Sequence, residues 1–152
     1  MSDINSLVGQ ELGCSQWILI TQDMVNRFAR LTQDEQWIHV DVERARQFMP
    51  ETGTIVHGYF TLSLVSRMIQ QVRENLPESF RSRIVNAINY GVNNLRFTGV
   101  VPVGSRVRGR VGLHAIEPTA TGSKLTFSVT VEIEGRDRPA LVAENVVLFN
   151  LK

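Results

Sequence analysis

The sequence predicts an α+β fold in which an antiparallel sheet wraps around a long central helix, and three observations predict it. The first is the stretch "GYFTLSLVSRMIQQVRENL" (58–76), whose first part is apolar or small on nearly every side, as in a buried helix. The second is that apolar residues recur with a period of two from about residue 84 onward. The third is that one face of each expected strand is apolar, so the sheet must cover something, and the helix is the obvious candidate.

Before the central helix, the sequence is expected to be mainly helical. A helix is predicted through "MVNRFARL" (24–31), with Thr21 or Asp23 as its N-cap. A second helix is predicted through "VERARQF" (42–48), and Asp41 directly before it has the side chain of an N-cap.

After the central helix, four strands are predicted, separated by "VPVG", "EPTATG" and "GRDRP", which are rich in turn residues. Alternation is strictest in "KLTFSVTVEIEG". The predicted strands cover 84–97, 105–117, 124–135 and 139–151. Because the sequence contains no internal repeat, low-complexity tract or linker, a single domain over 1–152 is expected.

The composition narrows the possible partners. A net charge of +1 gives no electrostatic reason to expect nucleic acid or a membrane surface as a partner. No segment approaches the roughly 20 apolar residues that span a bilayer, and the first ten residues do not resemble a signal peptide. Cys14 is the single cysteine, so no intrachain disulfide can form, and a reducing compartment, most simply the cytoplasm, is expected. Cysteine and histidine with zinc spacing are absent from the sequence, and no metal is expected.

The stretch "TQDEQWIHVD" (32–41) brings an acid and an imidazole close together in sequence. Five positions at about 100° each leave Asp34 and His39 roughly 140° apart on a helix, so the two side chains can cooperate only across a turn. Taken alone, the pair is more typical of a solvated or capping loop than of a catalytic site.

With its surroundings, this stretch resembles the MaoC-like hot dog family of (R)-specific enoyl-CoA hydratases. The family signature is D-x-N-P-x-H followed by a downstream H-G at the start of the central helix, and "NYGVNNLRFTGVVPVGSRVR" (89–108) is similar to a further family pattern. The resemblance covers about residues 10–150. The positions that match the signature are Asp34, Gln36, Trp37, His39, His57 and Gly58.

Two positions depart from the signature, because Gln36 stands where Asn is usual and Trp37 where Pro is usual. The string "QWIHVDVERA" resembles a subgroup described as nodulation-protein-N-like. The departures are expected to change the shape of the substrate pocket more than the chemistry.

The resemblance implies a role for each matched residue. Asp34 would be the general base toward water and would then protonate C2, while His39 would hold and polarise the same water. The backbone N–H of Gly58 would stabilise the enolate oxygen of the thioester, which suits a first-turn amide without an intrahelical partner. Gln36, Trp37, His57 and Ser63 are the candidate substrate-binding residues, each with a packing or supporting role as the alternative.

Reversible hydration of trans-2-enoyl-CoA to (R)-3-hydroxyacyl-CoA is therefore the predicted function, without a cofactor beyond the coenzyme A of the substrate. An acyl-CoA thioesterase and a non-catalytic module that binds acyl thioesters are the alternatives. Arg106, Arg108 and Arg110 are interpreted as the solvated face of a strand rather than as contacts to the phosphates of coenzyme A. An exposed sheet edge, together with the resemblance, predicts a homodimer, with a dimer of dimers as an open extension.

Overall fold

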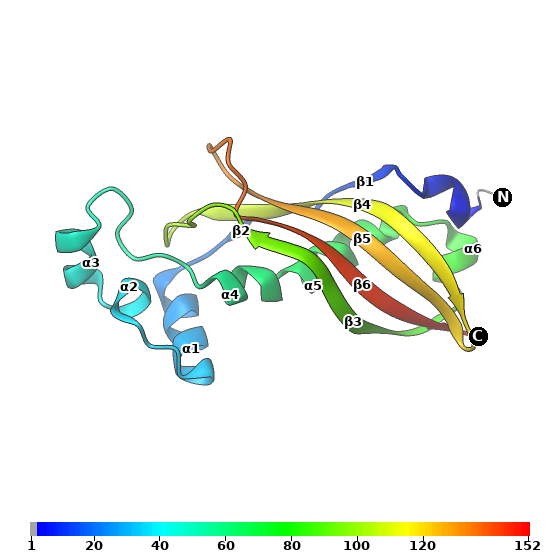
Figure 1. Cartoon of the computed structure of the whole chain (residues 1–152), viewed down its shortest axis with the longest axis horizontal. Coiled ribbons are helices and arrows are strands. Elements are labelled where there is room, and N and C mark those ends of the chain that lie inside the picture. Colours follow the sequence, from blue (N-terminus) through cyan, green and yellow to red (C-terminus); the bar gives the residue numbers. More distant parts are fainter. Residues whose placement is uncertain (1–2) are drawn as a thin grey trace.

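A computed structural model describes residues 3–152, in which one antiparallel sheet curves around a helical segment (Figure 1). The helices are η1 (Ile4–Leu7), α1 (Gln22–Thr32), α2 (Trp37–Val40), α3 (Val42–Phe48), α4 (Gly58–Ser63), α5 (Val65–Val72), η2 (Arg73–Asn75) and α6 (Glu78–Arg81). The strands are β1 (Glu11–Cys14), β2 (Ile18–Leu19), β3 (Ile84–Phe97), β4 (Arg106–Thr119), β5 (Gly122–Ile133) and β6 (Leu141–Leu151).

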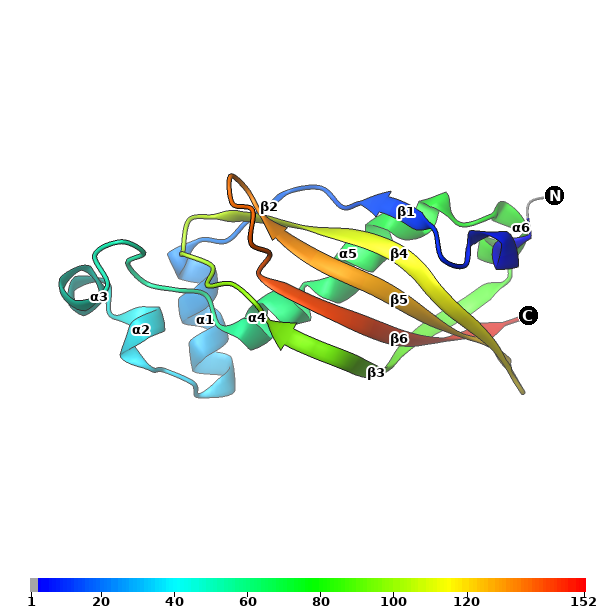
Figure 2. The same ribbon diagram turned by 45° about the horizontal axis from the view of Figure 1, so that its top comes forward.

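The sheet has the strand order β1-β4-β5-β6-β3, and β2 pairs with the first two residues of β4. Neighbouring strands are antiparallel throughout. Helices α4 and α5 run along the concave face, as Figure 2 shows from a second direction. The predicted α+β fold, an antiparallel sheet around a central helix, is confirmed, and its four long strands lie where the alternation placed them.

The core forms between α5 and the inner face of the sheet. On α5, Val65, Met68, Ile69 and Val72 are buried, and they pack with the inward residues of β4, β5 and β6. Full burial of each such side chain contributes roughly 1.5–3 kcal/mol. The helix approaches β4 so closely that a Cβ on Gly109 would lie 2.9 Å from the side chain of Met68.

The central helix is interrupted, whereas the sequence predicted one helix over 58–76. Helix α4 ends at Ser63, α5 begins at Val65, and the last turn is the 3₁₀ helix η2. The Ser63 hydroxyl donates a 2.6 Å hydrogen bond to the carbonyl of Phe60. A serine that bonds back to its own helix competes with the backbone ladder and bends helices, which accounts for a break at this position.

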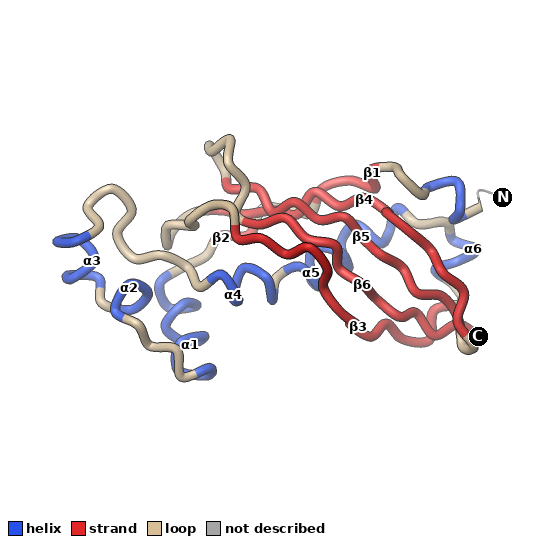
Figure 3. The backbone as a smooth tube through the Cα atoms, viewed as in Figure 1, coloured by secondary structure: helices blue, strands red, loops and turns tan. Residues whose placement is uncertain are grey.

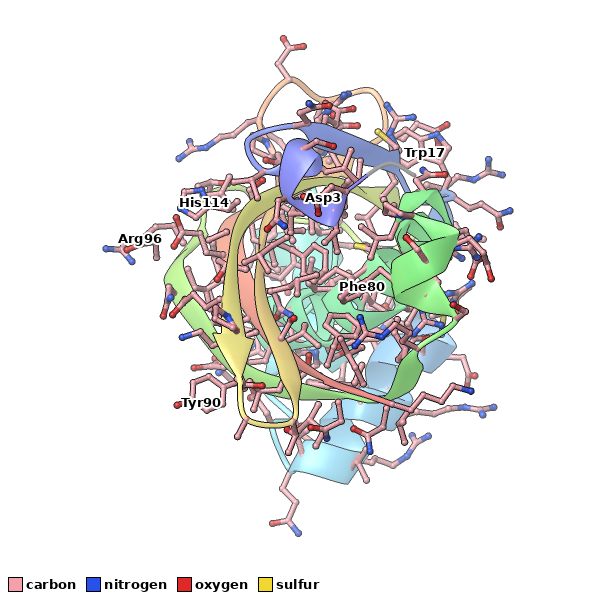
Figure 4. All side chains as sticks on the ribbon, turned by 90° about the vertical axis from the view of Figure 1, so that its right-hand side faces the viewer. Asp3, Trp17, Phe80, Tyr90, Arg96 and His114 are labelled. Atoms are coloured by element: carbon pink, nitrogen blue, oxygen red, sulfur yellow. The ribbon has the colours of Figure 1, made fainter. Side chains whose placement is uncertain are left out.

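Strand β3 differs from the expectation that one face of every strand is buried. Val85, Ile88 and Tyr90 are 62%, 51% and 67% exposed. The strand lies at the edge of the sheet, and Figure 4 shows Tyr90 projecting away from the protein while Phe80 points inward.

Helices α1, α2 and α3 gather beyond one end of the sheet (Figures 1 and 3). Thr21 caps α1 by accepting a hydrogen bond from the N–H of Met24 at 3.3 Å, and Asp41 caps α3 by accepting one from Arg44 at 3.0 Å. Both caps were among those predicted. Within residues 3–152, no helix is long and apolar enough to cross a membrane.

Candidate active site

The stretch with Asp34 and His39 forms a turn followed by a short helix. Gln33 adopts a left-handed conformation with φ of 59° and ends α1, so Asp34 lies in the turn. His39 lies on α2, which is a single helical turn. The two residues therefore do not share a helix. Cooperation between their side chains requires this, because Asp34 and His39 on one helix would point about 140° apart.

His57 holds the two residues together. Its ring stacks on the ring of His39 with centroids 3.7 Å apart and planes inclined by 23°. Its Nε2 lies 2.9 Å from the carbonyl oxygen of Asp34, so Nε2 carries the proton and donates it. The ring of Phe28, on α1, also packs against the ring of His57, with the two centroids 5.0 Å apart. The side chain of His57 therefore contacts both the turn at Asp34 and the imidazole of His39.

A carboxylate oxygen of Asp34 and one ring nitrogen from each histidine lie within 4.8 Å of one another. Such a group raises the question of a metal ion. Imidazole binds metals along a lone pair in the ring plane, and two stacked rings have nearly parallel planes, so their lone pairs do not aim at one point. The donor set does not fit a shared tetrahedral metal ion.

His39 presents an acceptor at neutral pH. Its Nδ1 lies 2.7 Å from the carbonyl of Ile55, which can only accept, so Nδ1 is protonated and Nε2 keeps its lone pair. Burial lowers the pKa of His39 below its usual value, the Ile55 carbonyl opposes this shift, and the neighbouring His57 adds to it.

This shift predicts the pH dependence of activity. Because the pKa of His39 is lowered, the ring stays neutral as the pH falls through 6.5 and accepts a hydrogen bond until a lower pH. We expect the limb of kcat/KM that belongs to His39 to lie below pH 6.5. A pH–rate profile measures it, since kcat/KM reports the free enzyme. An acidic limb centred above 6.5 would contradict the assignment.

Gln22 of α1 holds the backbone that carries His39. Its Nε2 donates to the carbonyl of His39 at 2.7 Å, and its Oε1 accepts from the hydroxyl of Thr54 at 2.6 Å. Thr54 is buried. The side-chain amide of Gln22 therefore links α2 to the extended segment that leads into α4.

Replacing Gln22 with leucine is expected to destabilise the protein by about 1–3 kcal/mol, because the His39 carbonyl and the Thr54 hydroxyl lose their partner. Urea unfolding measures the change. The control is Gln47→Leu, an exposed glutamine on α3. Equal free energies of unfolding for the two variants would show that the hydrogen bonds of the Gln22 side chain do not stabilise the protein.

A pocket with a volume of about 460 Å³ opens beside His39 and Gly58. The start of α4, the end of β3 and the connection from β3 to β4 form its walls. Thr61 lies one helical turn after Gly58 and is on the same wall. The lining residues are His39, Ile55, Val56, Gly58, Thr61, Phe97, Thr98, Gly99, Val100, Val101, Arg138 and Ala140.

Gly58 begins α4, and its N–H precedes the first hydrogen bond of that helix, from Thr61 N–H to the carbonyl of His57. The amide therefore has no intrahelical partner. The Phe97 ring lies so close that a Cβ on Gly58 would be 3.0 Å from two of its carbons. Only glycine leaves both the ring and the amide in this arrangement.

None of the four predicted substrate-binding residues, Gln36, Trp37, His57 and Ser63, lines this pocket. Gln36 donates to the carboxylate of Asp34 at 3.3 Å. Trp37 packs against Phe48 and beneath the guanidinium of Arg44, which is 4.5 Å from the ring centroid. Ser63 bonds back to its own helix. Their roles toward substrate stay predictions.

The arginine stripe on β4 faces acids on β5 and directly after its end. Arg108 and Arg110 both contact Glu132, at 2.7 and 2.9 Å, and Arg106 lies 3.9 Å from Glu134. This pairing agrees with the interpretation of a strand's outer face.

The profile of the MaoC like domain matches residues 3–134. The chain belongs to the MaoC-like dehydratase family. It is 43% identical over 150 residues to 3-hydroxyacyl-thioester dehydratase Z of Mycobacterium tuberculosis, with 98% of this chain and 95% of that protein covered. It is 44% identical over 155 residues to nodulation protein N of Rhizobium meliloti, with 100% and 93% covered. The resemblance seen in the sequence, including its subgroup, is confirmed.

Among solved structures, the (R)-hydratase from A. caviae superposes with a TM-score of 0.72 at 26% identity, covering 95% of this chain and 96% of the other. R-hydratase PhaJ1 from Pseudomonas aeruginosa has a TM-score of 0.70 at 22% identity, covering 95% and 83%, and shows the shared hot dog fold. The protein is an enzyme of the MaoC-like dehydratase family, which supports hydratase or dehydratase activity.

Proposed function

We propose that this enzyme catalyses the reversible hydration of trans-2-enoyl-CoA to (R)-3-hydroxyacyl-CoA. The observation that carries the proposal is that His39, with Nε2 as an acceptor, and Gly58 line one pocket, while a carboxylate oxygen of Asp34 lies within 4.8 Å of a ring nitrogen of His39. The thioester would lie with its carbonyl oxygen toward the Gly58 N–H.

The atoms of the addition balance without a further reactant. Asp34 takes a proton from a water that His39 also holds, and the water oxygen bonds to C3. The electron pair of the C2–C3 double bond moves toward the thioester oxygen, where the Gly58 N–H stabilises the negative charge. Protonated Asp34 then gives the proton to C2. Dehydration follows the same steps in reverse, and no cofactor is part of the proposal.

The test is an absorbance assay with crotonyl-CoA and longer 2-enoyl-CoA substrates. Hydration removes the conjugated enoyl thioester, so its absorbance falls without release of free thiol. Chiral analysis of the product should give the (R)-alcohol. Lack of turnover across the chain-length series would overturn the proposal.

Two other functions give different results in the same samples. A thioesterase would release thiol from saturated acyl-CoA, and a binding module would bind acyl-CoA without turnover. The retained Asp34, His39 and Gly58 favour the hydratase over both.

We also propose a cytoplasmic location, because a chain whose single cysteine is Cys14 cannot form an intrachain disulfide and suits a reducing compartment. Finally, we propose a homodimer formed at β3. Strand β3 is a 14-residue edge without proline and with Arg96 as its one charged residue, so little prevents it from pairing with another strand. Its exposed apolar side chains would be covered by a second copy. Light scattering at micromolar concentration should give twice the 17.1 kDa chain mass. A monomer would contradict the proposal.

A further inference from the structure

The pocket beside His39 has an uneven distribution of charge. Its lining includes no carboxylate, and Arg138 is the one Lys or Arg side chain on it in the described part of the chain. The walls near His39 and Gly58 are otherwise largely apolar. Such a pocket favours a ligand with an apolar reacting part and an anionic end.

Arg138 is held at the pocket by its backbone. It lies between β5 and β6, and the next two carbonyls accept hydrogen bonds from the β3–β4 connection: Pro139 from the Thr98 hydroxyl at 2.7 Å, and Ala140 from the Thr98 N–H at 3.0 Å. A Cβ on Gly99 would lie 2.6 Å from the Pro139 carbonyl oxygen. The two segments therefore pack backbone to backbone, which places Arg138 beside the wall formed by residues 97–101.

The guanidinium of Arg138 is available for a ligand. Its side chain is exposed, and no ion pair or side-chain hydrogen bond of Arg138 occurs among residues 3–152. By contrast, Arg106, Arg108 and Arg110 face Glu132 or Glu134. Arg96 projects from the outer side of the sheet, away from the core (Figure 4).

We propose that Arg138 binds a phosphate of the carrier that bears the thioester. This inference rests on the proposed function, because it takes the acyl part of the ligand to lie beside His39. Both coenzyme A and a carrier protein attach the acyl group through phosphopantetheine, so a phosphate at the end of that arm is the chemistry that the two carriers share. A guanidinium binds phosphate with two parallel hydrogen bonds, which gives both affinity and orientation.

The experiment compares Arg138→Gln and Arg138→Lys with the parent on three crotonyl thioesters: of coenzyme A, of 4′-phosphopantetheine and of pantetheine, which has no phosphate. Arg136→Gln is the matched control, because Arg136 is exposed on the same loop and does not line this pocket. We expect Arg138→Gln to raise KM by about tenfold or more for the two phosphorylated thioesters with kcat little changed. The lysine variant should fall between, and KM for the pantetheine thioester should not change.

The three substrates also identify the phosphate. A rise in KM with both phosphorylated thioesters assigns the phosphate of the arm, and a rise with the coenzyme A thioester alone assigns the phosphates of its adenosine part. An equal rise with the pantetheine thioester, or none with any substrate, would overturn the proposal. Calorimetry with free coenzyme A tests the contact without turnover: weaker binding by Arg138→Gln but not Arg136→Gln supports it even if no enoyl thioester is hydrated, and equal binding by both variants counts against it.

Discussion

Replacing Asp34 with asparagine is expected to lower kcat for hydration of crotonyl-CoA by about 10³-fold, because the amide cannot accept the proton of the attacking water. The fold should persist. The link from this turn to His57 runs through the backbone carbonyl of Asp34, which the substitution keeps. Steady-state kinetics measure the loss, and the melting temperature checks the fold.

The matched control for this prediction is Glu35→Gln. Glu35 is the next residue in the same turn, carries the same charge change and is exposed. Its kcat should stay within a factor of about two of the parent, because a surface charge contributes little to a neighbouring proton transfer. If Asp34→Asn kept full activity, or if both variants lost activity equally, Asp34 would not be the base.

The sequence predicted the strands of the sheet better than the path of the central helix. Alternation with period two arises from the strand backbone itself, so β5 and β6 could be placed from their side chains alone. The break at Leu64 depends on the Ser63 hydroxyl bonding to Phe60 rather than pointing elsewhere. Serine occurs in continuous helices as well, so its presence does not predict which bond it makes.

Strand β3 shows another limit. Residues 84–97 were predicted as a strand, and they form one, but burial of one face depended on which neighbours the strand would have. Its position at the edge follows from the order in which the strands pair, and that order is a tertiary property.

For the proposed site, the sequence named residues whose chemistry is visible in the residue type, and it did not name residues whose proposed role depends on contacts in the fold. Asp34, His39 and Gly58 belong to a short pattern. Gln22 supports His39 across a separation of 17 residues, and nothing in a helix-starting glutamine signals that bond. Arg138 sits in a turn-rich connection where an arginine is ordinary, so only the folded pocket singles it out.

Replacing Gly58 with alanine is expected to lower kcat by about 10²-fold, since a displacement of about 1 Å at a reacting group can cost that much. The new Cβ would lie 3.0 Å from the Phe97 ring, closer than the 3.5–4.0 Å or so at which carbon atoms pack. Phe97 is 46% exposed and lines the pocket, so its ring can take up part of the clash. We expect the start of α4, which carries the Gly58 amide, to take up the rest by shifting away from the ring.

Gly91→Ala is the control, because a Cβ at that glycine would meet nothing within 4 Å in its own chain. Gly91 lies on β3, so light scattering should first show that this variant keeps the mass of the parent. A double-mutant cycle with Phe97→Leu separates the two causes of the loss. If the ring clash displaces the amide, the smaller side chain should return part of kcat to the Gly58→Ala protein. If the Cβ instead blocks the thioester itself, the double variant should stay as slow as the single one. Unchanged kcat in Gly58→Ala would show that the thioester oxygen does not lie against this amide.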